Sequence, residues 1–296
     1  MAACLTTAQE YATLLAKYDT WMFDCDGVLW RGDDIIQGVI DVLAILRDQG
    51  KKVIFVTNNA TKSRRSYKTK FDELGIPVNV DEIYGSAYAA AVYISSILQL
   101  PKSQKVYVVG MKGLEEELAE EDIAFIGGTD PADNTLAPFS LDNFVPDPDV
   151  GAVVCGLDKS INYTKLSKAL QYLFKGCTFV ATNEDSTFPT ANGLLIGAGG
   201  VHAPLRYASG REPVCAGKPS TIMLDCIRAK VDYDPARTIM VGDRLNTDIL
   251  FGKAGGLSTL LVLTGVTSEA DISGQNASNI VPDYVVQSLG DLLILR

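Results

Sequence analysis

The sequence contains one histidine, His202, among its 296 residues. A Ser-His-Asp triad or a histidine phospho-carrier would have to depend on that single residue. His202 lies in a stretch flanked by glycine and proline, without any companion motif, so we expect a structural role for it. The six cysteines are scattered and include no CxxC pair, a pattern typical of free thiols rather than of a disulfide framework or a zinc site.

Long apolar runs and an excess of positive charge are also lacking. No stretch approaches the roughly 18 apolar residues that a membrane-spanning helix needs, and residues 1–10 show no signal-peptide pattern. The formal net charge is −10, which disfavours binding to nucleic acid or to an anionic membrane. We therefore expect a cytoplasmic protein, in which an anionic substrate would be held by a metal ion or by a few placed cations.

A phosphate-binding glycine loop is absent as well. No GxxxxGK[ST] segment occurs, which excludes a P-loop kinase, and the glycine cluster at 197–200 lacks GxGxxG spacing and favours a plain loop. What the sequence does contain is an alternation of short apolar runs with helical patterns. Strands are expected at 20–23, 52–56, 238–241 and 259–263, and helices at 39–46 and 222–229. Such alternation predicts a parallel sheet covered on both faces.

The middle of the chain repeats this alternation on a smaller scale. Strands are expected at 106–109, 151–155 and 177–181, helices at 114–121 and 163–174, and a long loop at 129–149. We therefore predict an α/β protein with a Rossmann-like parallel-sheet core, formed by residues 1–100 and 209–296. A second α/β domain, residues 101–208, is inserted into it.

Polar residues follow the predicted strands of the core at four places. Asp24 and Asp26 come directly after the first strand, and two carboxylates at this spacing can attack as a nucleophile, transfer a proton and help to hold a hard cation. Gly27 lets the chain turn and lets main-chain N–H groups approach an anion. An Asp-x-Asp pair alone is common, and its alternative interpretation is a surface turn.

The other three places supply donors, a cation and more carboxylates. Thr57 and Asn58 follow the second strand and suit phosphate oxygens, or else cap a helix. Lys218 precedes a predicted helix start and is either a phosphate-binding cation or a solvated loop lysine. Asp243 and Asp248 can bind Mg²⁺ directly and brace its waters, or serve as helix caps. Carboxyl ends of parallel strands meet at one edge, so the four segments are expected to form one site.

Taken together, these segments resemble the haloacid dehalogenase superfamily. The matching stretches are Phe23-Asp24-Cys25-Asp26-Gly27-Val28-Leu29-Trp30, Val56-Thr57-Asn58-Asn59-Ala60-Thr61, Gly217-Lys218-Pro219-Ser220 and Gly242-Asp243-Arg244…Thr247-Asp248-Ile249. The inserted segment looks like the large α/β cap of the C2 branch, most similar to eukaryotic phosphoglycolate and 4-nitrophenyl phosphatases. Supporting stretches are 181–185 in the cap and 263–266 near the end of the chain.

The resemblance implies a Mg²⁺-dependent phosphatase and assigns a role to each motif residue. Asp24 is the implied nucleophile, which becomes an aspartyl phosphate, and Asp26 is the implied general acid and base. Thr57, Asn58 and Lys218 would bind the phosphoryl group. Asp24, the main-chain carbonyl of Asp26, and Asp243 would hold Mg²⁺, with Asp248 and Gly27 in support.

The implied substrate is a small phosphate monoester. The expected one is 2-phosphoglycolate, with 4-nitrophenyl phosphate as a generic substrate and pyridoxal phosphate or a broad set of metabolites as the alternative. Specificity is expected from the cap loop, through Asn183 and Phe188, with Glu184 and Asp185 at the rim or paired. The resemblance also suggests a homodimer formed through the cap.

Two other functions compete with that of a phosphatase. The first is a catalytically silent regulatory or binding module on the same fold, against which the intact Asp24, Asp26, Lys218 and Asp243 argue. The second is a carbon–halogen hydrolase, which the second carboxylate disfavours. Cys25, between the two aspartates, is a candidate for redox control or else an inert core thiol. The basic run 64–70 is interpreted as a solvated helix face rather than as a rim that guides anions.

Overall fold

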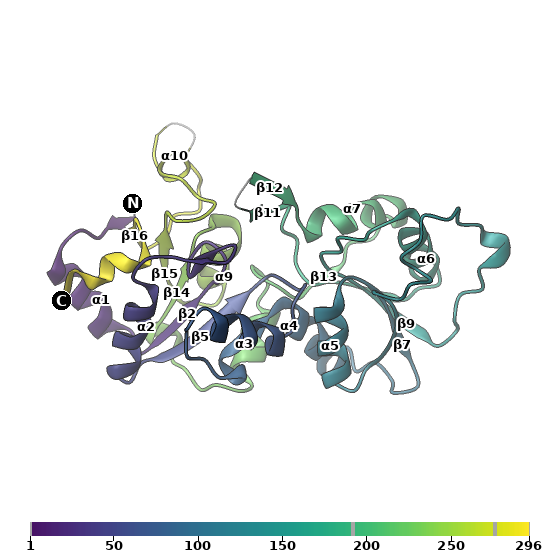
Figure 1. Cartoon of the computed structure of the whole chain (residues 1–296), viewed down its shortest axis with the longest axis horizontal. Coiled ribbons are helices and arrows are strands. Elements are labelled where there is room, and N and C mark those ends of the chain that lie inside the picture. Colours follow the sequence, from purple (N-terminus) through teal and green to yellow (C-terminus); the bar gives the residue numbers. More distant parts are fainter. Residues whose placement is uncertain (1, 191–192, 275–276, 296) are drawn as a thin grey trace.

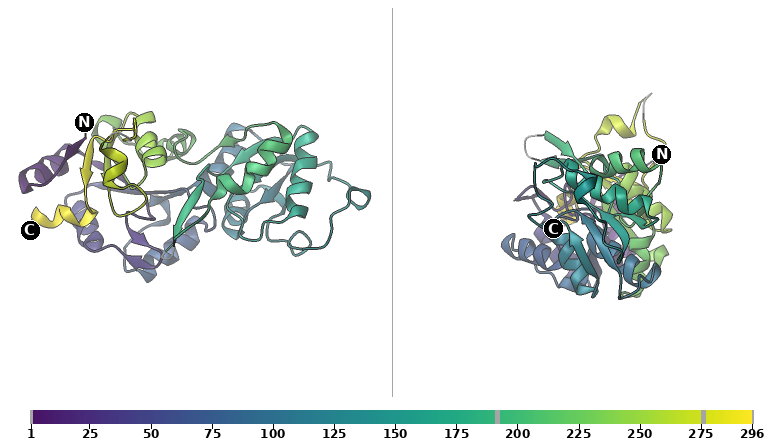
Figure 2. Two further views of the ribbon diagram at one scale, coloured as in Figure 1. Left: turned by 90° about the horizontal axis from the view of Figure 1, so that it is seen from above. Right: turned by 90° about the vertical axis from the view of Figure 1, so that its right-hand side faces the viewer.

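A sheet of parallel strands forms the centre of the core, in the order β1-β16-β15-β14-β2-β5-β6. The computed structural model describes residues 2–190, 193–274 and 277–295. The strands of this sheet are β1 (Ala3–Cys4), β16 (Tyr284–Val286), β15 (Ser258–Val262), β14 (Thr238–Gly242), β2 (Thr20–Phe23), β5 (Lys52–Thr57) and β6 (Ile83–Gly85). Both ends of the chain lie in this half of the elongated molecule (Figures 1 and 2).

Helices cover both faces of the core sheet. Trp21 and Phe23 of β2 face one cluster of buried side chains, and Met22 faces another, as the two-residue period of a strand requires. The first cluster is covered by α1 (Ala8–Lys17), α2 (Val39–Asp48), α3 (Arg64–Glu73) and the 3₁₀ turn Leu289–Leu295. The second is covered by α4 (Ser86–Val92), α5 (Lys112–Glu120), α8 (Ile222–Arg228) and α9 (Leu250–Ala254). Two short π-helical segments, Tyr93–Ile97 and Leu245–Ile249, extend α4 and precede α9.

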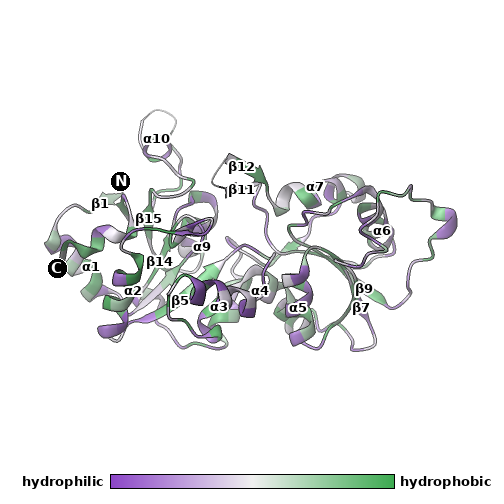
Figure 3. Cartoon of the chain, in the orientation of Figure 1, coloured by the Kyte–Doolittle hydropathy of each residue, from purple (hydrophilic) through white to green (hydrophobic). Residues whose placement is uncertain are grey.

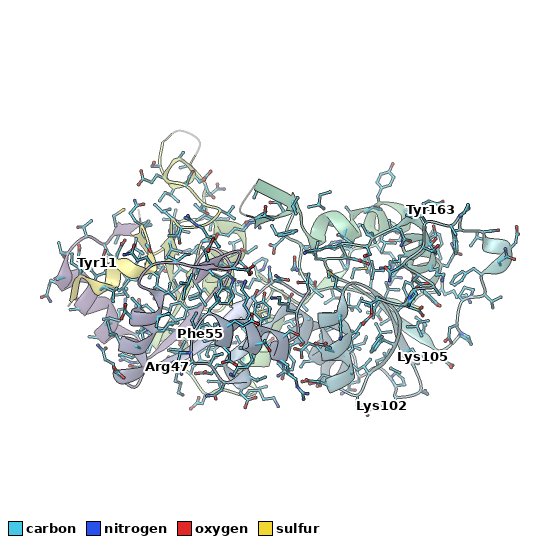
Figure 4. All side chains as sticks on the ribbon, in the orientation of Figure 1. Tyr11, Arg47, Phe55, Lys102, Lys105 and Tyr163 are labelled. Carbon is cyan, nitrogen blue, oxygen red and sulfur yellow. The ribbon has the colours of Figure 1, made fainter. Side chains whose placement is uncertain are left out.

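The middle of the chain forms the cap, which has its own parallel sheet in the order β13-β10-β9-β7-β8. Its strands are β7 (Lys105–Val109), β8 (Ala124–Gly127), β9 (Val150–Cys155), β10 (Thr178–Ala181) and β13 (Val214–Cys215). The helices α6 (Tyr163–Phe174) and α7 (Ala198–Ser209) pack on one face of it. Phe55 lies in the core, whereas Lys102, Lys105 and Tyr163 lie in the cap (Figure 4).

The other face of the cap sheet is joined to the core by a shared apolar cluster. Val106, Val108 and Val154 of the cap belong to the same cluster as Ile54 and Val56 of β5. The helices α4 and α5 lie between the two sheets. Figure 3 shows that the strands in the middle of each half are apolar. The cap is therefore packed against the core through apolar side chains, in addition to the two chain segments that connect the domains.

Two hairpins and one short helix complete the fold. The pairs are β3 (Trp30–Arg31) with β4 (Asp34–Ile35), directly after the first aspartates, and β11 (Thr187–Thr190) with β12 (Gly193–Ile196), which reaches from the cap toward the core (Figure 1). The helix α10 (Glu269–Ile272) follows β15. In the part of the chain that the structure describes, no helix is long and apolar enough to cross a membrane.

The predicted fold class is confirmed: a Rossmann-like α/β core carries an inserted α/β cap. Strand β2 and helix α6 begin and end at the predicted residues, and α2 stops before Gly50, whose φ is +70°. Strand β13 of the cap sheet lies beyond the boundary predicted at residue 208. It has only two residues, too few to show a pattern in the sequence. The division of the chain into 1–100, 101–208 and 209–296 otherwise stays a prediction.

Candidate active site

Three neighbouring strands bring the predicted site residues to one edge of the core sheet. The order β14-β2-β5 places Asp243, Asp24 and Thr57 side by side at the carboxyl ends. The main-chain N–H of Asp24 continues the ladder by donating to the carbonyl of Val241 at 2.9 Å. These residues line a cavity of about 290 Å³ between core and cap, and the cap contributes residues of the loop after β10 and of β11. Ligands of open parallel sheets bind at this edge.

Three buried carboxylates lie close together in the lining of this cavity. Asp24, Asp243 and Asp248 each place one carboxylate oxygen within 4.8 Å of the others. Burial raises the pKa of Asp24 well above its usual range, despite the attraction of Lys218. Burial and the neighbouring Asp248 raise the pKa of Asp243 to about 7. Each shift has the same physical cause: negative charge is gathered where water cannot solvate it.

Lys218 is the cation of this cluster and is only 2% exposed. Its Nζ lies 2.6 Å from Asp24 Oδ1 and 2.8 Å from Asp248 Oδ1, and it donates to the carbonyl of Val56 at 2.9 Å. Burial acts to lower the pKa of Lys218, but the two carboxylates outweigh it and the pKa is raised. Lys218 is therefore a fixed positive charge beside the predicted nucleophile.

The charge balance of the cluster suits a divalent cation. Among the described residues, Lys218 is the cation that forms ion pairs with this cluster, so three ionised carboxylates and one lysine leave a net charge of −2. The donor atoms are all carboxylate oxygens. Such hard ligands suit Mg²⁺ better than they suit soft transition metals. The residues present therefore fit a hard divalent cation. Asp24 and Asp243 belong to the predicted metal set, and the structure places Asp248, predicted only in support, in the same cluster.

Asp26 lines the same cavity, but its carboxylate is not part of the three-carboxylate cluster. Its Oδ1 accepts a hydrogen bond from Trp30 Nε1 at 2.9 Å. The main chain turns sharply behind it, where Gly27 N donates to the carbonyl of Trp30 at 2.8 Å. This turn directs the two aspartates of the Asp-x-Asp pair to different positions, one into the cluster and one beside the hairpin β3–β4.

Two glycines make room for Asp243. Gly27 has a φ of +88°, and a Cβ placed on it would lie 2.6 Å from Asp243 Oδ2. A Cβ on Gly265 would lie 1.7 Å from the same atom. That oxygen accepts a hydrogen bond of 2.6 Å from Val266 N, so it is held against the backbone of the 263–266 stretch. Gly27 is therefore required both for its positive φ and for its close packing against Asp243. The sequence predicted only that this glycine lets the chain turn.

Thr57 and Asn58 both reach the cavity, but they are engaged differently. Thr57 is buried, and its Oγ1 accepts from Asn59 N at 3.1 Å and lies 3.3 Å from Tyr67 Oη. The side-chain amide of Asn58 bonds to both main-chain groups of Lys218: Oδ1 accepts from Lys218 N at 2.8 Å, and Nδ2 donates to Lys218 O at 3.0 Å. The Asn58 side chain thus positions Lys218, a role that the sequence did not indicate.

The cap loop meets the core through a polar network. Asn183 is buried, and its Nδ2 donates to the carbonyl of Asn58 at 2.6 Å. Asp185 accepts from Asn58 Nδ2 at 3.2 Å and lies 3.7 Å from Arg244, which also donates to the carbonyl of Thr187 at 3.0 Å. The hydrogen bond from Asn183 to Asn58 therefore joins the cap to the core. Phe188 lines the cavity from β11. Glu184 is exposed and pairs with Arg206 at 3.6 Å, so both acidic residues are paired.

The interpretation of the basic run 64–70 is wrong for two of its members. Arg64 is only 13% exposed, because its guanidinium pairs with Glu117 and Glu120 of the cap helix α5 at 3.0 Å each. Lys70 lines the cavity, with its Nζ 2.7 Å from the carbonyl of Gly32. The side chain of Arg65 is 76% exposed, as a solvated face requires. The sequence could not indicate which residues of α3 face the cap.

His202 and Cys25 are core residues. His202 is buried against Phe179, with Nε2 3.3 Å from the carbonyl of Asn183, and burial lowers its pKa. Cys25 is buried in the first core cluster, and burial, then Asp24, raise the pKa of its thiol well above the usual value. A protonated, enclosed thiol is a poor nucleophile and resists oxidation. These environments favour the structural interpretation of both residues.

Comparisons with known proteins show the family to which the chain belongs. Residues 21–124 match the family of haloacid dehalogenase-like hydrolases, and residues 215–292 match the related HAD-hydrolase-like family. A 4-nitrophenylphosphatase of Schizosaccharomyces pombe is 47% identical over 99% of both chains. Phosphoglycolate phosphatase 2 of Arabidopsis thaliana is 42% identical over 100% of this chain and 99% of its own.

A solved structure extends the match to three dimensions. The glycerol phosphate phosphatase of Mycobacterium tuberculosis, crystallised in complex with magnesium, superimposes with a TM-score of 0.78 at 30% identity, over 94% of this chain and 77% of that one. The similarity thus covers core and cap together. The chain belongs to the haloacid dehalogenase-like hydrolases, in the C2-capped branch that holds the 4-nitrophenyl and phosphoglycolate phosphatases.

Proposed function

We propose that this phosphatase hydrolyses small phosphate monoesters with the help of Mg²⁺, through a phosphoryl group carried transiently by Asp24. The observation that supports this most directly is the position of the Asp24 carboxylate in the lining of the cavity, 2.6 Å from Lys218 Nζ and beside Asp243 and Asp248. A carboxylate can attack an anionic phosphate only where positive charge offsets the repulsion.

The proposed reaction has two steps. In the first, Asp24 attacks phosphorus, the bond from phosphorus to the ester oxygen breaks, and Asp26 gives its proton to the departing oxygen. In the second, water attacks the phosphorus of the aspartyl phosphate while Asp26 accepts a proton from it, which releases inorganic phosphate and restores both aspartates. Each aspartate is thereby regenerated after one turnover.

The remaining residues bind and neutralise the phosphoryl group. Lys218 and Thr57 line the cavity beside Asp24 and would contact phosphoryl oxygens. The side-chain donors of Asn58 are already engaged with Lys218 and Asp185, so we assign its contribution to the main-chain N–H. Asp24, Asp243 and the main-chain carbonyl of Asp26 would hold Mg²⁺, with Asp248 beside them. When bound, Mg²⁺ supplies charge neutralisation for the phosphoryl oxygens.

The proposed substrate is a compact ester, with 2-phosphoglycolate first and 4-nitrophenyl phosphate as a generic substrate. The cavity of about 290 Å³ and the phosphatases among the relatives support this choice. Initial rates with Mg²⁺ should be compared for 2-phosphoglycolate, glycerol phosphate, pyridoxal phosphate, sugar phosphates, nucleotides and 4-nitrophenyl phosphate. Preference for a phosphoprotein over all of them would contradict the proposal. Absence of turnover with every ester would favour the silent binding module.

We expect activity to depend on Mg²⁺. Protein treated with excess EDTA should lose turnover and regain it when Mg²⁺ is added, whereas Ca²⁺ should inhibit because its larger, looser coordination misplaces Asp24. Mg²⁺ should also raise the thermal unfolding midpoint, because it binds only the folded state. Asp243→Asn should abolish that rise, and Asp225→Asn, which changes an exposed carboxylate of α8, should preserve it. Full activity in excess EDTA would refute the metal requirement.

We expect Phe188 to affect discrimination between substrates. Phe188→Ala removes a ring from the cavity wall contributed by the cap, so relative kcat/KM values among the esters should shift by about fivefold or more. Leu194→Ala is the matched control, because Leu194 stands on the same hairpin, is 62% exposed and does not line the cavity. An unchanged substrate profile in Phe188→Ala would show that the cap ring has no part in specificity.

A further inference from the structure

Trp30 has an unusual position for a buried aromatic residue, because its one polar atom reaches the active site. Its side chain is 0% exposed, and its Nε1 donates to Asp26 Oδ1 at 2.9 Å. Among the residues that the structure describes, Trp30 Nε1 is the one hydrogen-bond donor to the Asp26 carboxylate. The orientation of that carboxylate therefore depends on where the indole is held.

The indole is held on several sides by helix α3. Its ring stacks on Tyr67 with ring centres 6.4 Å apart and an interplanar angle of 23°, and it meets Phe71 edge to face at 4.9 Å. Lys70 Nζ lies 4.5 Å from the centre of the indole, while it donates to the carbonyl of Gly32 in the same hairpin. A ring enclosed in this way has little rotational freedom, so its N–H has a fixed direction.

We propose that Trp30 is a positioning residue that orients Asp26 for proton transfer to the departing oxygen. This inference rests on the proposed function, in which Asp26 is the general acid. The indole occupies Oδ1, which leaves Oδ2 as the oxygen that carries the proton. As the bond from phosphorus to the ester oxygen breaks, Oδ2 gives this proton to that oxygen and the charge left on Asp26 is shared with the indole N–H. The fixed hydrogen bond at Oδ1 holds Oδ2 in one direction, and this orientation is the contribution that we assign to the indole.

The choice of ester separates this role from ordinary packing. An alkyl alcohol is a poor leaving group and needs a proton as it departs, whereas 4-nitrophenolate is stable and departs without one. The kcat/KM value reports the steps up to departure of the alcohol, and therefore excludes the later attack of water. A misplaced Asp26 should thus lower kcat/KM for 2-phosphoglycolate much more than for 4-nitrophenyl phosphate.

The test is Trp30→Phe, which keeps an aromatic ring between Tyr67 and Phe71 and removes the N–H. We expect kcat/KM for 2-phosphoglycolate to fall by about tenfold or more, a part of the ~10²–10⁴-fold that proton transfer contributes, with less than a threefold change for 4-nitrophenyl phosphate. In an Asp26→Asn background, Trp30→Phe should cause no further loss with 2-phosphoglycolate, because no proton remains to be positioned.

The chain offers a matched control in its second tryptophan. Trp21 is also 0% exposed and also packed between aromatic rings, but its Nε1 has no hydrogen-bond partner among the described residues. Trp21→Phe should therefore leave both kcat/KM values unchanged. If Trp30→Phe does not fold, benzothienylalanine at position 30, which has sulfur in place of the N–H and nearly the same shape, gives the same comparison.

The outcomes distinguish two failures. Equal losses for the two esters in a folded Trp30→Phe protein, or further loss in the Asp26→Asn background, would assign Trp30 to packing alone and overturn the inference while the phosphatase mechanism stands. A wild-type protein without activity toward either ester would overturn the proposed function, and this inference with it.

Discussion

Replacing the nucleophile is expected to have the largest effect on catalysis: Asp24→Asn should lower kcat on the order of 10⁴-fold or more. The amide has nearly the shape of the carboxylate but does not attack phosphorus and is a weak ligand for Mg²⁺. The fold should remain, because burial already raises the pKa of Asp24 and so penalises its charge. We expect the unfolding midpoint in urea to stay equal or to rise.

One measurement and one control variant complete this test. Acid quenching of the wild-type reaction followed by mass spectrometry should find one phosphoryl group on the peptide containing Asp24, and none in the variant. Asp122→Asn is the control, since Asp122 is an exposed carboxylate of the cap paired with Lys102 at 2.8 Å. Appreciable phosphatase activity in well-folded Asp24→Asn protein would sink the mechanism.

The second large effect is expected from Lys218→Met, which should abolish turnover and also lower the free energy of unfolding. Lys218 is buried between Asp24 and Asp248, at 2.6 and 2.8 Å. Removing it leaves buried carboxylates without their cation, a change that costs about 3–5 kcal/mol in comparable buried pairs. The measurement is urea denaturation without metal, together with kcat in Mg²⁺.

The cap provides a matched control for Lys218→Met. Lys165 is also buried, and its Nζ lies 2.6 Å from the buried Asp158. Lys165→Met should destabilise the protein to a similar degree, but the folded fraction should keep its kcat because the pair lies outside the site cavity. If both variants lose stability and neither loses turnover, Lys218 is a structural lysine only.

Much of the core was predictable because its strands carry strong local signals. The runs at 20–23 and 52–56 are apolar and end at polar residues, so strand and site could be predicted together. The parallel order β14-β2-β5 then brings Asp243, Asp24 and Thr57 to one edge. The chemical roles assigned to these residues stay predictions until the variants are measured.

The relationships that could not be predicted are those between side chains far apart in the sequence. The sequence motifs contain Asn58 and Trp30. They do not indicate that the Asn58 amide forms hydrogen bonds with the main chain of Lys218, or that the Trp30 indole forms one with Asp26. Arg244 follows Asp243 directly, yet its contact with Thr187 crosses from core to cap. Side-chain direction depends on tertiary packing, and one sequence gives no measure of it.

The apolar cluster shared by the two sheets limits how this enzyme could be redesigned. Val106, Val154 and Val180 of the cap are buried together with Ile54 and Met240 of the core, and α4 and α5 lie between them. In a chimera that carries the cap of a relative, the apolar side chains of cap and core would therefore not fit together. The resulting cavities or overlaps at this contact, the apolar seam, would lower the stability. Grafting only the hairpin β11–β12, whose strands pair mainly with each other, would alter the cavity wall while leaving that seam intact.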